Sequence, residues 1–237
     1  MDPAPFPPET LERVARLLGP LYRYHQFTLR GAEHLPREGP CILVVHHSLA
    51  TYDGFLIGDA LRRQTGRVLR GLGDDRLFQI PGVRELMLGV GIVPASPEAG
   101  ERLLREGYVV GLAPGGMWES LRPYTERRRS RWKDRRGFAR LALRTGAPLV
   151  LAAAPAADEV FKVYPSRLTD RLYELAHLPL PVARGRGPTL IPRRVKLTAW
   201  LSEPIYPPPL DPPRIEEQAE ALRQEAEARM AELLRQR

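Results

Sequence analysis

Residues 41–55 constrain the fold of this chain more than any other stretch. Cys41 to Val45 are all apolar, which predicts a short buried strand. His46 and His47 follow this strand, and an apolar-periodic run that predicts a helix begins near Asp53. A carboxylate is favoured there because it accepts hydrogen bonds from the free N–H groups of the first helical turn. The pattern places polar side chains at a sheet edge, where α/β proteins collect ligands and catalytic groups.

Short apolar runs and helical patterns alternate along the rest of the chain. Further strands are expected at 68–71, 91–94, 108–113, 149–154 and 195–201. Helices are expected at 84–89, 98–105, 138–144, 168–176 and 215–234. This alternation predicts an α/β fold with a mostly parallel central sheet flanked by helices.

The two ends of the chain carry helical patterns of their own. Residues 9–18 are amphipathic, and Gly19-Pro20 predicts the end of that helix. This segment has two interpretations, an arm packed on the core and a helix on a membrane surface. The C-terminal helix is charged with a thin apolar stripe. We expect an N-terminal helical arm at 1–30, an α/β domain at 31–206, and a proline-rich connector with a C-terminal helix at 207–237.

Composition narrows the functional classes. The chain has 237 residues, 43% of them hydrophobic, which is enough for one sizeable core. Cys41 is the only cysteine, which excludes an internal disulfide and a cysteine metal cluster. The net charge is +8, and this excess favours anionic partners such as lipid head groups or a phosphorylated substrate. Nucleic acid is not expected as a partner, because the arginine-rich stretches lack the interleaved aromatic residues that stack on bases.

The sequence shows no apolar run of the roughly eighteen residues that span a bilayer. Its first ten residues are rich in proline and do not resemble a signal peptide. We therefore expect a cytoplasmic protein that associates peripherally with the inner face of a membrane.

His47 and Asp53 form the first candidate catalytic pair. A carboxylate within hydrogen-bond reach of an imidazole fixes its tautomer and stabilises the imidazolium that forms when the other nitrogen takes a proton. Such a pair activates a hydroxyl group, on the protein or on a substrate. The competing interpretation is structural: Asp53 only caps its helix and His47 only packs.

The second candidate site is the segment from Ala113 to Arg122, which follows another expected strand. Gly115 and Gly116 allow backbone N–H groups to approach a ligand closely, as in an oxyanion hole or a phosphate cradle. A simple turn is the competing interpretation. The arginine-rich run 125–136 follows directly, which favours contact with an anion over an ordinary solvated loop.

The order of these pieces resembles the glycerolipid acyltransferase superfamily, which contains the 1-acylglycerol-3-phosphate acyltransferases. The resemblance covers residues 31–207 and is greatest to the diacylglycerol-acyltransferase-like and phytyl ester synthase branch. It rests on five blocks: Gly31-Ala-Glu-His-Leu-Pro36, His47 to Asp53, Phe78-Gln-Ile-Pro-Gly82, the Pro114-Gly-Gly block through Leu121, and 135–142.

The resemblance implies an O-acyltransferase that needs no metal and no cofactor. It would move a fatty acyl group from an acyl thioester, on coenzyme A or acyl carrier protein, to the hydroxyl of a lipid alcohol. His47 would be the general base, Asp53 would orient it, and the hydroxyl would attack the thioester directly. A histidine of ordinary pKa, about 6.5, suits this role. Substrate binding is expected from Gly115, Gly116, Trp118, Glu119, Arg122 and Arg76.

Two departures from the superfamily pattern bear on the acceptor. Five residues separate His47 from Asp53 where four are usual, and members of the neutral-lipid branch share this longer spacing. Pro114-Gly-Gly replaces the Glu-Gly-Thr-Arg block that holds a phosphate in phospholipid-making members. Both favour a neutral acceptor. The alternatives are a 1-acylglycerol-3-phosphate acyltransferase of phospholipid synthesis, a hydrolase that uses water, and a non-catalytic basic membrane-binding module.

Overall fold

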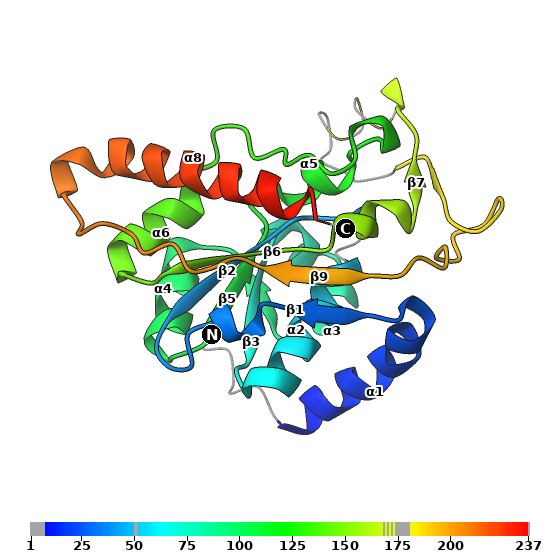
Figure 1. Cartoon of the computed structure of the whole chain (residues 1–237), viewed down its shortest axis with the longest axis horizontal. Helices are drawn as coiled ribbons and strands as arrows, with labels where there is room; N and C mark the ends of the chain where they lie inside the picture. Colours follow the sequence, from blue (N-terminus) through cyan, green and yellow to red (C-terminus); the bar gives the residue numbers. More distant parts are fainter. Residues whose placement is uncertain are drawn as a thin grey trace.

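The computed structural model describes residues 8–49, 52–167, 169, 171, 173 and 181–236. In this part of the chain a seven-stranded sheet, in the order β1-β9-β6-β2-β5-β3-β4, forms the middle layer (Figure 1). Its strands are β1 (Thr28–Arg30), β2 (Cys41–Val45), β3 (Leu69–Gly73), β4 (Ile92–Pro94), β5 (Val109–Leu112), β6 (Leu149–Ala153) and β9 (Thr198–Leu201). A separate pair, β7 (Lys162–Val163) and β8 (Ala183–Arg184), is antiparallel.

Helices cover both faces of the sheet. In Figure 1, α6 (Gly137–Thr145) and α8 (Ile215–Leu233) lie above the sheet, whereas α1 (Pro8–His25) and α2 (Tyr52–Thr65) lie below it. Further helices within the described ranges are α3 (Val83–Gly89), α4 (Pro97–Arg105) and α5 (Gly116–Ser120). Turns of 3-10 helix lie at Ala32–His34, Asp75–Gln79, Tyr124–Glu126, Pro155–Glu159 and Pro212–Arg214. The predicted α/β fold, with helices at both ends of the chain, is confirmed.

Strand β2 lies at the point where the order of the sheet reverses. It pairs in parallel with β5 on one side and β6 on the other, and β3 and β4 continue the parallel part beyond β5. The chain leaves β2 through α2 on one face and reaches β6 through α6 on the opposite face. Strands β9 and β1 run antiparallel to β6. The carboxyl ends of β2, β5 and β6 therefore meet at one edge, where ligands bind in open α/β sheets.

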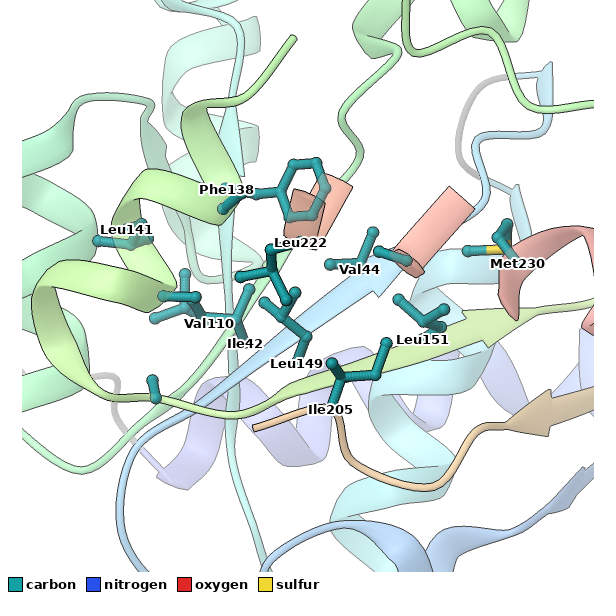
Figure 2. Close-up of a cluster of buried hydrophobic side chains, with 14 of the residues drawn as sticks. Ile42, Val44, Val110, Phe138, Leu141, Leu149, Leu151, Ile205, Leu222 and Met230 are labelled. Atoms are coloured by element: carbon teal, nitrogen blue, oxygen red, sulfur yellow. The ribbon is translucent and has the colours of Figure 1, made fainter. Parts of the chain in front are cut away.

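The residues of β2 are buried on both faces, which explains why the strand has no polar side chain. Ile42 and Val44 pack toward α6 and α8, and Leu43 packs toward α1 and α2. Figure 2 shows the first of these cores, where Leu222 of α8 lies among side chains of α6, β2 and β6. Because helices cover both faces, the strand is a continuous hydrophobic run and not an alternating one.

The N-terminal helix extends beyond its predicted end. Helix α1 continues through Gly19-Pro20 to His25, although proline removes one helical hydrogen bond. Packing compensates for this loss: Leu18 is buried, and the Tyr22 hydroxyl donates to the Leu56 carbonyl of α2 at 2.9 Å. The helix therefore packs on the sheet, and the chain returns through β1, a strand that the sequence did not predict.

Two further expected elements need comment, one because it begins later than predicted and one because it lies mostly outside the described residues. Strand β9 begins at Thr198, three residues later than expected, and the expected helix 168–176 falls mostly outside the described residues. None of the helices in the described ranges has the length and apolar character needed to cross a bilayer.

We expect Leu222→Ala to lower the free energy of unfolding by about 2–5 kcal/mol, because the side chain is buried in the core of Figure 2 and its loss leaves a cavity. Urea unfolding monitored by circular dichroism measures this change. The control is Glu225→Ala on the same helix, an exposed position that should change stability by less than about 0.5 kcal/mol. An equal loss in both variants would contradict the packing of α8 on the sheet.

Candidate active site

His46 and His47 extend the carboxyl end of β2. The His46 N–H donates to the Ala152 carbonyl at 2.9 Å, so the pairing of β2 with β6 continues one residue beyond the strand. Because side chains alternate along an extended chain, the two histidines leave β2 on opposite sides. His46 continues the α6 and α8 side of the sheet, and His47 continues the α2 side.

Asp53 lies in the first turn of α2 and is fully buried. Its Oδ1 accepts a hydrogen bond from the Ser48 hydroxyl, whereas Oδ2 has no hydrogen-bond partner among the described residues. Burial raises the pKa of Asp53 to about 6, against the opposing effects of the Ser48 hydrogen bond and of His46. The carboxylate is therefore ionised at neutral pH but close to protonation.

His47 contacts the same serine. Its Nδ1 lies 2.8 Å from the Ser48 carbonyl oxygen, so Nδ1 carries the proton and Nε2 is the basic nitrogen. Burial lowers the pKa of His47 to about 4, helped by the neighbouring His46 and Arg122 side chains and opposed by the Ser48 hydrogen bond. The expected ordinary pKa of His47 is therefore wrong, because partial burial disfavours the charged ring. It is neutral at pH 7.

Ser48 joins the two candidate catalytic residues in this structure. Its carbonyl accepts from His47, and its hydroxyl donates to Asp53. No role for Ser48 was predicted from the sequence. The available signal was a serine directly after His47, because serine hydroxyls in loops often form hydrogen bonds with nearby groups.

His46 belongs to a second, buried cluster with Glu119, Arg122 and Asp158. Its Nε2 lies 2.6 Å from Arg122 Nη2, and because a guanidinium only donates, Nε2 is the acceptor and Nδ1 carries the proton. Nδ1 lies 3.7 Å from Glu119 Oε1. Burial by itself would raise the pKa of Asp158, but its contacts with His46 and Arg122 lower it below its usual range.

Arg122 is the centre of this cluster. Its Nη2 donates to Asp158 Oδ1 at 2.7 Å and to the His47 carbonyl at 3.3 Å, and its Nη1 donates to the Glu119 carbonyl at 3.2 Å. The side chain is 2% exposed. Arg122 therefore fixes the backbone of His47 and has its donors engaged by protein groups. The sequence analysis did not single out Asp158. The available signal was its position shortly after β6, whose carboxyl end lies beside those of β2 and β5.

The Pro114-Gly-Gly loop is shaped by its neighbours. A Cβ at Gly115 would collide with the side chain of Glu119, and Gly116 has a φ of 54° with the Arg135 guanidinium against its Cα. The Gly116 N–H donates to the Ala113 carbonyl at 3.0 Å, and Arg135 donates to the Gly115 carbonyl at 2.6 Å. Packing thus excludes a larger residue at Gly115, whereas Gly116 has a left-handed backbone conformation that favours glycine. The Gly116 N–H is used within the turn.

Glu119 is fully buried, and burial raises its pKa against the opposing effects of the His46 and Arg122 side chains. Its Oε1 accepts from the Arg131 N–H at 3.0 Å, which ties α5 to the arginine-rich run. That run is anchored and not simply solvated, because Trp132 is fully buried in the core.

The two remaining candidates lie on the surface side of the site. Trp118 is partly buried, with the charged groups of Arg131 and Lys133 within 5.5 and 5.4 Å of its ring centroid. Arg76 follows β3 and is half-exposed, with Asp74 as its ion-pair partner at 3.9 Å. Within the described residues, the hydrogen bonds and ion pairs of Arg76 do not reach the His47 or Arg122 groups.

We expect Asp53→Asn to stabilise the protein above pH 6 and to have no such effect near pH 4. The folded-state pKa, about 6, is above the ordinary value of 3.8, so the carboxyl contributes stability below pH 3.8 that is lost as the pH rises through 6. The shift of about two units corresponds to a gain of about 3 kcal/mol for the amide at pH 8 relative to pH 4. Urea unfolding at both pH values measures it.

The control for this prediction is Ser48→Ala, which removes the hydroxyl but keeps the titrating carboxylate. Its stability should retain the pH dependence that Asp53→Asn loses. A stability difference between Asp53→Asn and the unmodified chain that is constant from pH 4 to pH 8 would contradict the assigned pKa.

Sequence comparisons relate the chain to proteins of lipid metabolism. The human "DGAT1/2-independent enzyme synthesizing storage lipids" is 30% identical over 191 residues, covering 80% of this chain and 56% of that protein. The bovine protein of the same name is 28% identical over 190 residues, with 80% and 54% covered. An uncharacterized protein of Mycobacterium tuberculosis is 29% identical over 181 residues, with 74% and 51% covered. The chain thus spans about half the length of these relatives.

A solved structure shows the same fold. The crystal structure of the 1-acyl-sn-glycerophosphate (LPA) acyltransferase from Thermotoga maritima superposes with a TM-score of 0.59 at 14% identity, covering 96% of this chain and 80% of that one. The Acyltransferase family model matches residues 26–153, which include β2, α2, the Pro114-Gly-Gly loop and β6. Since this match covers more than half of the chain and contains both candidate catalytic residues, the protein belongs to the acyltransferase family.

Proposed function

We propose that this chain transfers a fatty acyl group from an acyl thioester to the hydroxyl of a lipid alcohol, with His47 as the general base. The observation that carries the proposal is the His47–Ser48–Asp53 arrangement at the carboxyl end of β2, in a chain of the acyltransferase family. The site lies at the reversal point of the sheet, as expected for a ligand site.

The chemistry of each residue follows from its environment. His47 is neutral with its proton on Nδ1, so Nε2 can accept the proton of an acceptor hydroxyl as that oxygen attacks the thioester carbonyl. The imidazolium then returns the proton to the departing thiolate. Asp53 is ionised above about pH 6, and its negative charge stabilises the imidazolium, which would otherwise be unfavourable in this partly buried position.

The buried cluster supports the same step from the other side of β2. Arg122 holds the His47 carbonyl, and the Arg122–Asp158 ion pair links the segments that follow β5 and β6. Arg122 and Asp158 are therefore proposed as positioning residues, and not as groups that touch the substrate.

For the acceptor, we propose a neutral lipid alcohol. Arg122, one candidate for binding an acceptor phosphate, is fully engaged by protein groups, and Pro114-Gly-Gly supplies no arginine of its own. The names of the mammalian relatives refer to the synthesis of storage lipids, which is consistent with this choice. The Thermotoga protein of the same fold is named as an LPA acyltransferase, so a phosphate-bearing acceptor is the second candidate.

We also propose that the chain works at an anionic membrane surface. The net charge of +8 supports this, and Leu17 of α1 is 77% exposed. Basic residues near an anionic leaflet contribute about 1 kcal/mol each to binding.

We expect His47→Gln to lower kcat for acyl transfer by about 10²–10⁴-fold, the usual contribution of a general base, while the free energy of unfolding is retained. Labelled acyl thioester and a panel of alcohols, with product identification, measure the transfer. The comparison variant is His46→Gln, which disturbs the buried Arg122 cluster and should reduce stability while turnover remains measurable.

The result that contradicts this assignment is an inactive but folded His46→Gln protein beside an active His47→Gln protein. Release of free fatty acid in the presence of acceptor would indicate a hydrolase. Binding to anionic vesicles without any acyl transfer would indicate a non-catalytic membrane-binding module.

The acceptor is tested by comparing kcat/KM for diacylglycerol, a long-chain alcohol and lysophosphatidic acid, since this ratio reports transition-state stabilisation for each. We expect the neutral acceptors to give the higher values, because Met117 and Trp118 follow the glycine loop where a phosphate-binding arginine would be needed. A tenfold or greater preference for lysophosphatidic acid, about 1.4 kcal/mol, would establish the phospholipid alternative.

A further inference from the structure

Three basic side chains and two tyrosine rings form a row beside the active site. The Arg127 guanidinium lies 4.4 Å from the Tyr124 ring centroid, and the Lys162 ammonium lies 4.9 Å from the same ring. The Lys162 ammonium also lies 5.4 Å from the ring of Tyr164, and the Arg184 guanidinium lies 6.0 Å from that ring. We call this alternating row of Arg127, Tyr124, Lys162, Tyr164 and Arg184 the cation ladder.

The fold brings the ladder together from three segments. Tyr124 begins a 3-10 turn two residues after Arg122, and Arg127 follows that turn. Lys162 and Arg184 are direct partners in the antiparallel β7–β8 pair. The Tyr164 N–H extends this pair by donating to the Val182 carbonyl at 2.8 Å.

None of the three cations of the ladder has an ion-pair partner within the part of the chain that the structure describes. The nearby carboxylates are engaged elsewhere: Asp158 with Arg122, Glu159 with Arg128, and Glu126 with Arg131. Each ring face offsets part of the repulsion, by about 0.5–1 kcal/mol at exposed sites. The ladder therefore retains an excess positive charge that a multiply charged anion would neutralise.

A small pocket lies between one end of the ladder and the segments that follow β2, β5 and β6. Its lining includes Tyr124 and Arg127 of the ladder together with Leu49, Arg122 and Asp158. Leu49 follows His47 by two residues, and Arg122 binds the His47 carbonyl. A ligand anchored on the ladder would thus reach toward the end of β2.

We propose that the cation ladder binds the phosphate groups of a nucleotide-borne acyl donor, such as the adenosine 3′-phosphate 5′-diphosphate portion of coenzyme A. This inference rests on the proposed acyl transfer and identifies the donor class. Three cations in a row match a ligand with several phosphates. An acyl carrier protein or a lipid head group presents a single phosphate at the corresponding place.

The kinetic test compares two acyl donors. Lys162→Met and Arg184→Gln should each raise KM for acyl-coenzyme A tenfold or more, with kcat changed less than twofold. With the same acyl group on N-acetylcysteamine, which carries no phosphate, the two variants should match the unmodified chain. The matched control is Arg186→Gln, an exposed arginine in the same β7–β8 region that stacks on no ring of the described residues.

A binding measurement separates failure of this inference from failure of the proposed acyl transfer. Calorimetry with adenosine 3′,5′-bisphosphate requires no turnover, and the unmodified chain should bind it more weakly as salt rises, because screening weakens charge contacts. Lys162→Met should abolish the binding, and uncharged adenosine should not bind. If the chain is inactive but binds the bisphosphate through the ladder, the proposed acyl transfer is overturned and the ladder's phosphate binding stands.

An unchanged KM for acyl-coenzyme A in both ladder variants would overturn the donor assignment. If the same variants also float less on phosphatidylglycerol vesicles, the phosphate chemistry of the ladder belongs to a lipid surface.

Discussion

The Arg122–Asp158 ion pair is the interaction on which the edge with the candidate active site depends. Arg122 follows β5 and α5, Asp158 follows β6, and Arg122 also binds the His47 carbonyl at the end of β2. One guanidinium thus joins the ends of three neighbouring strands. A buried charge pair adds little net stability, but the loss of one partner is costly because the other charge is left unpaired. The pair therefore fixes the geometry of this edge more than it stabilises the fold.

Burial has opposite consequences for the two candidate catalytic residues. It lowers the pKa of His47 and raises the pKa of Asp53, since both charged forms are disfavoured away from water. At neutral pH His47 is therefore a neutral imidazole, and Asp53 is a costly buried carboxylate. In the proposed mechanism, the negative charge of Asp53 would stabilise the imidazolium that forms when His47 takes a proton.

Local sequence patterns predicted most of the sheet. Strand β2 has the expected bounds, and the apolar stripe of α8 is buried as expected. These predictions succeed because hydrophobic periodicity reports which face of an element is covered. Gly19-Pro20 is one exception: local propensity indicated a helix end, but packing of Leu18 and Tyr22 against the core carries α1 through the proline.

By itself, the sequence determined the α/β class and the resemblance to an acyltransferase. It also placed His47 after the buried strand β2 and Asp53 in the first turn of the following helix. Only the tertiary structure decided the partners of these residues. Arg122 meets His46 across 76 positions of the chain, and Lys162 meets Arg184 through a strand pair that no local pattern indicated. The physical reason is that periodicity and capping act over a few residues, whereas a side chain's hydrogen bonds, burial and pKa depend on segments that the fold brings together from elsewhere in the chain.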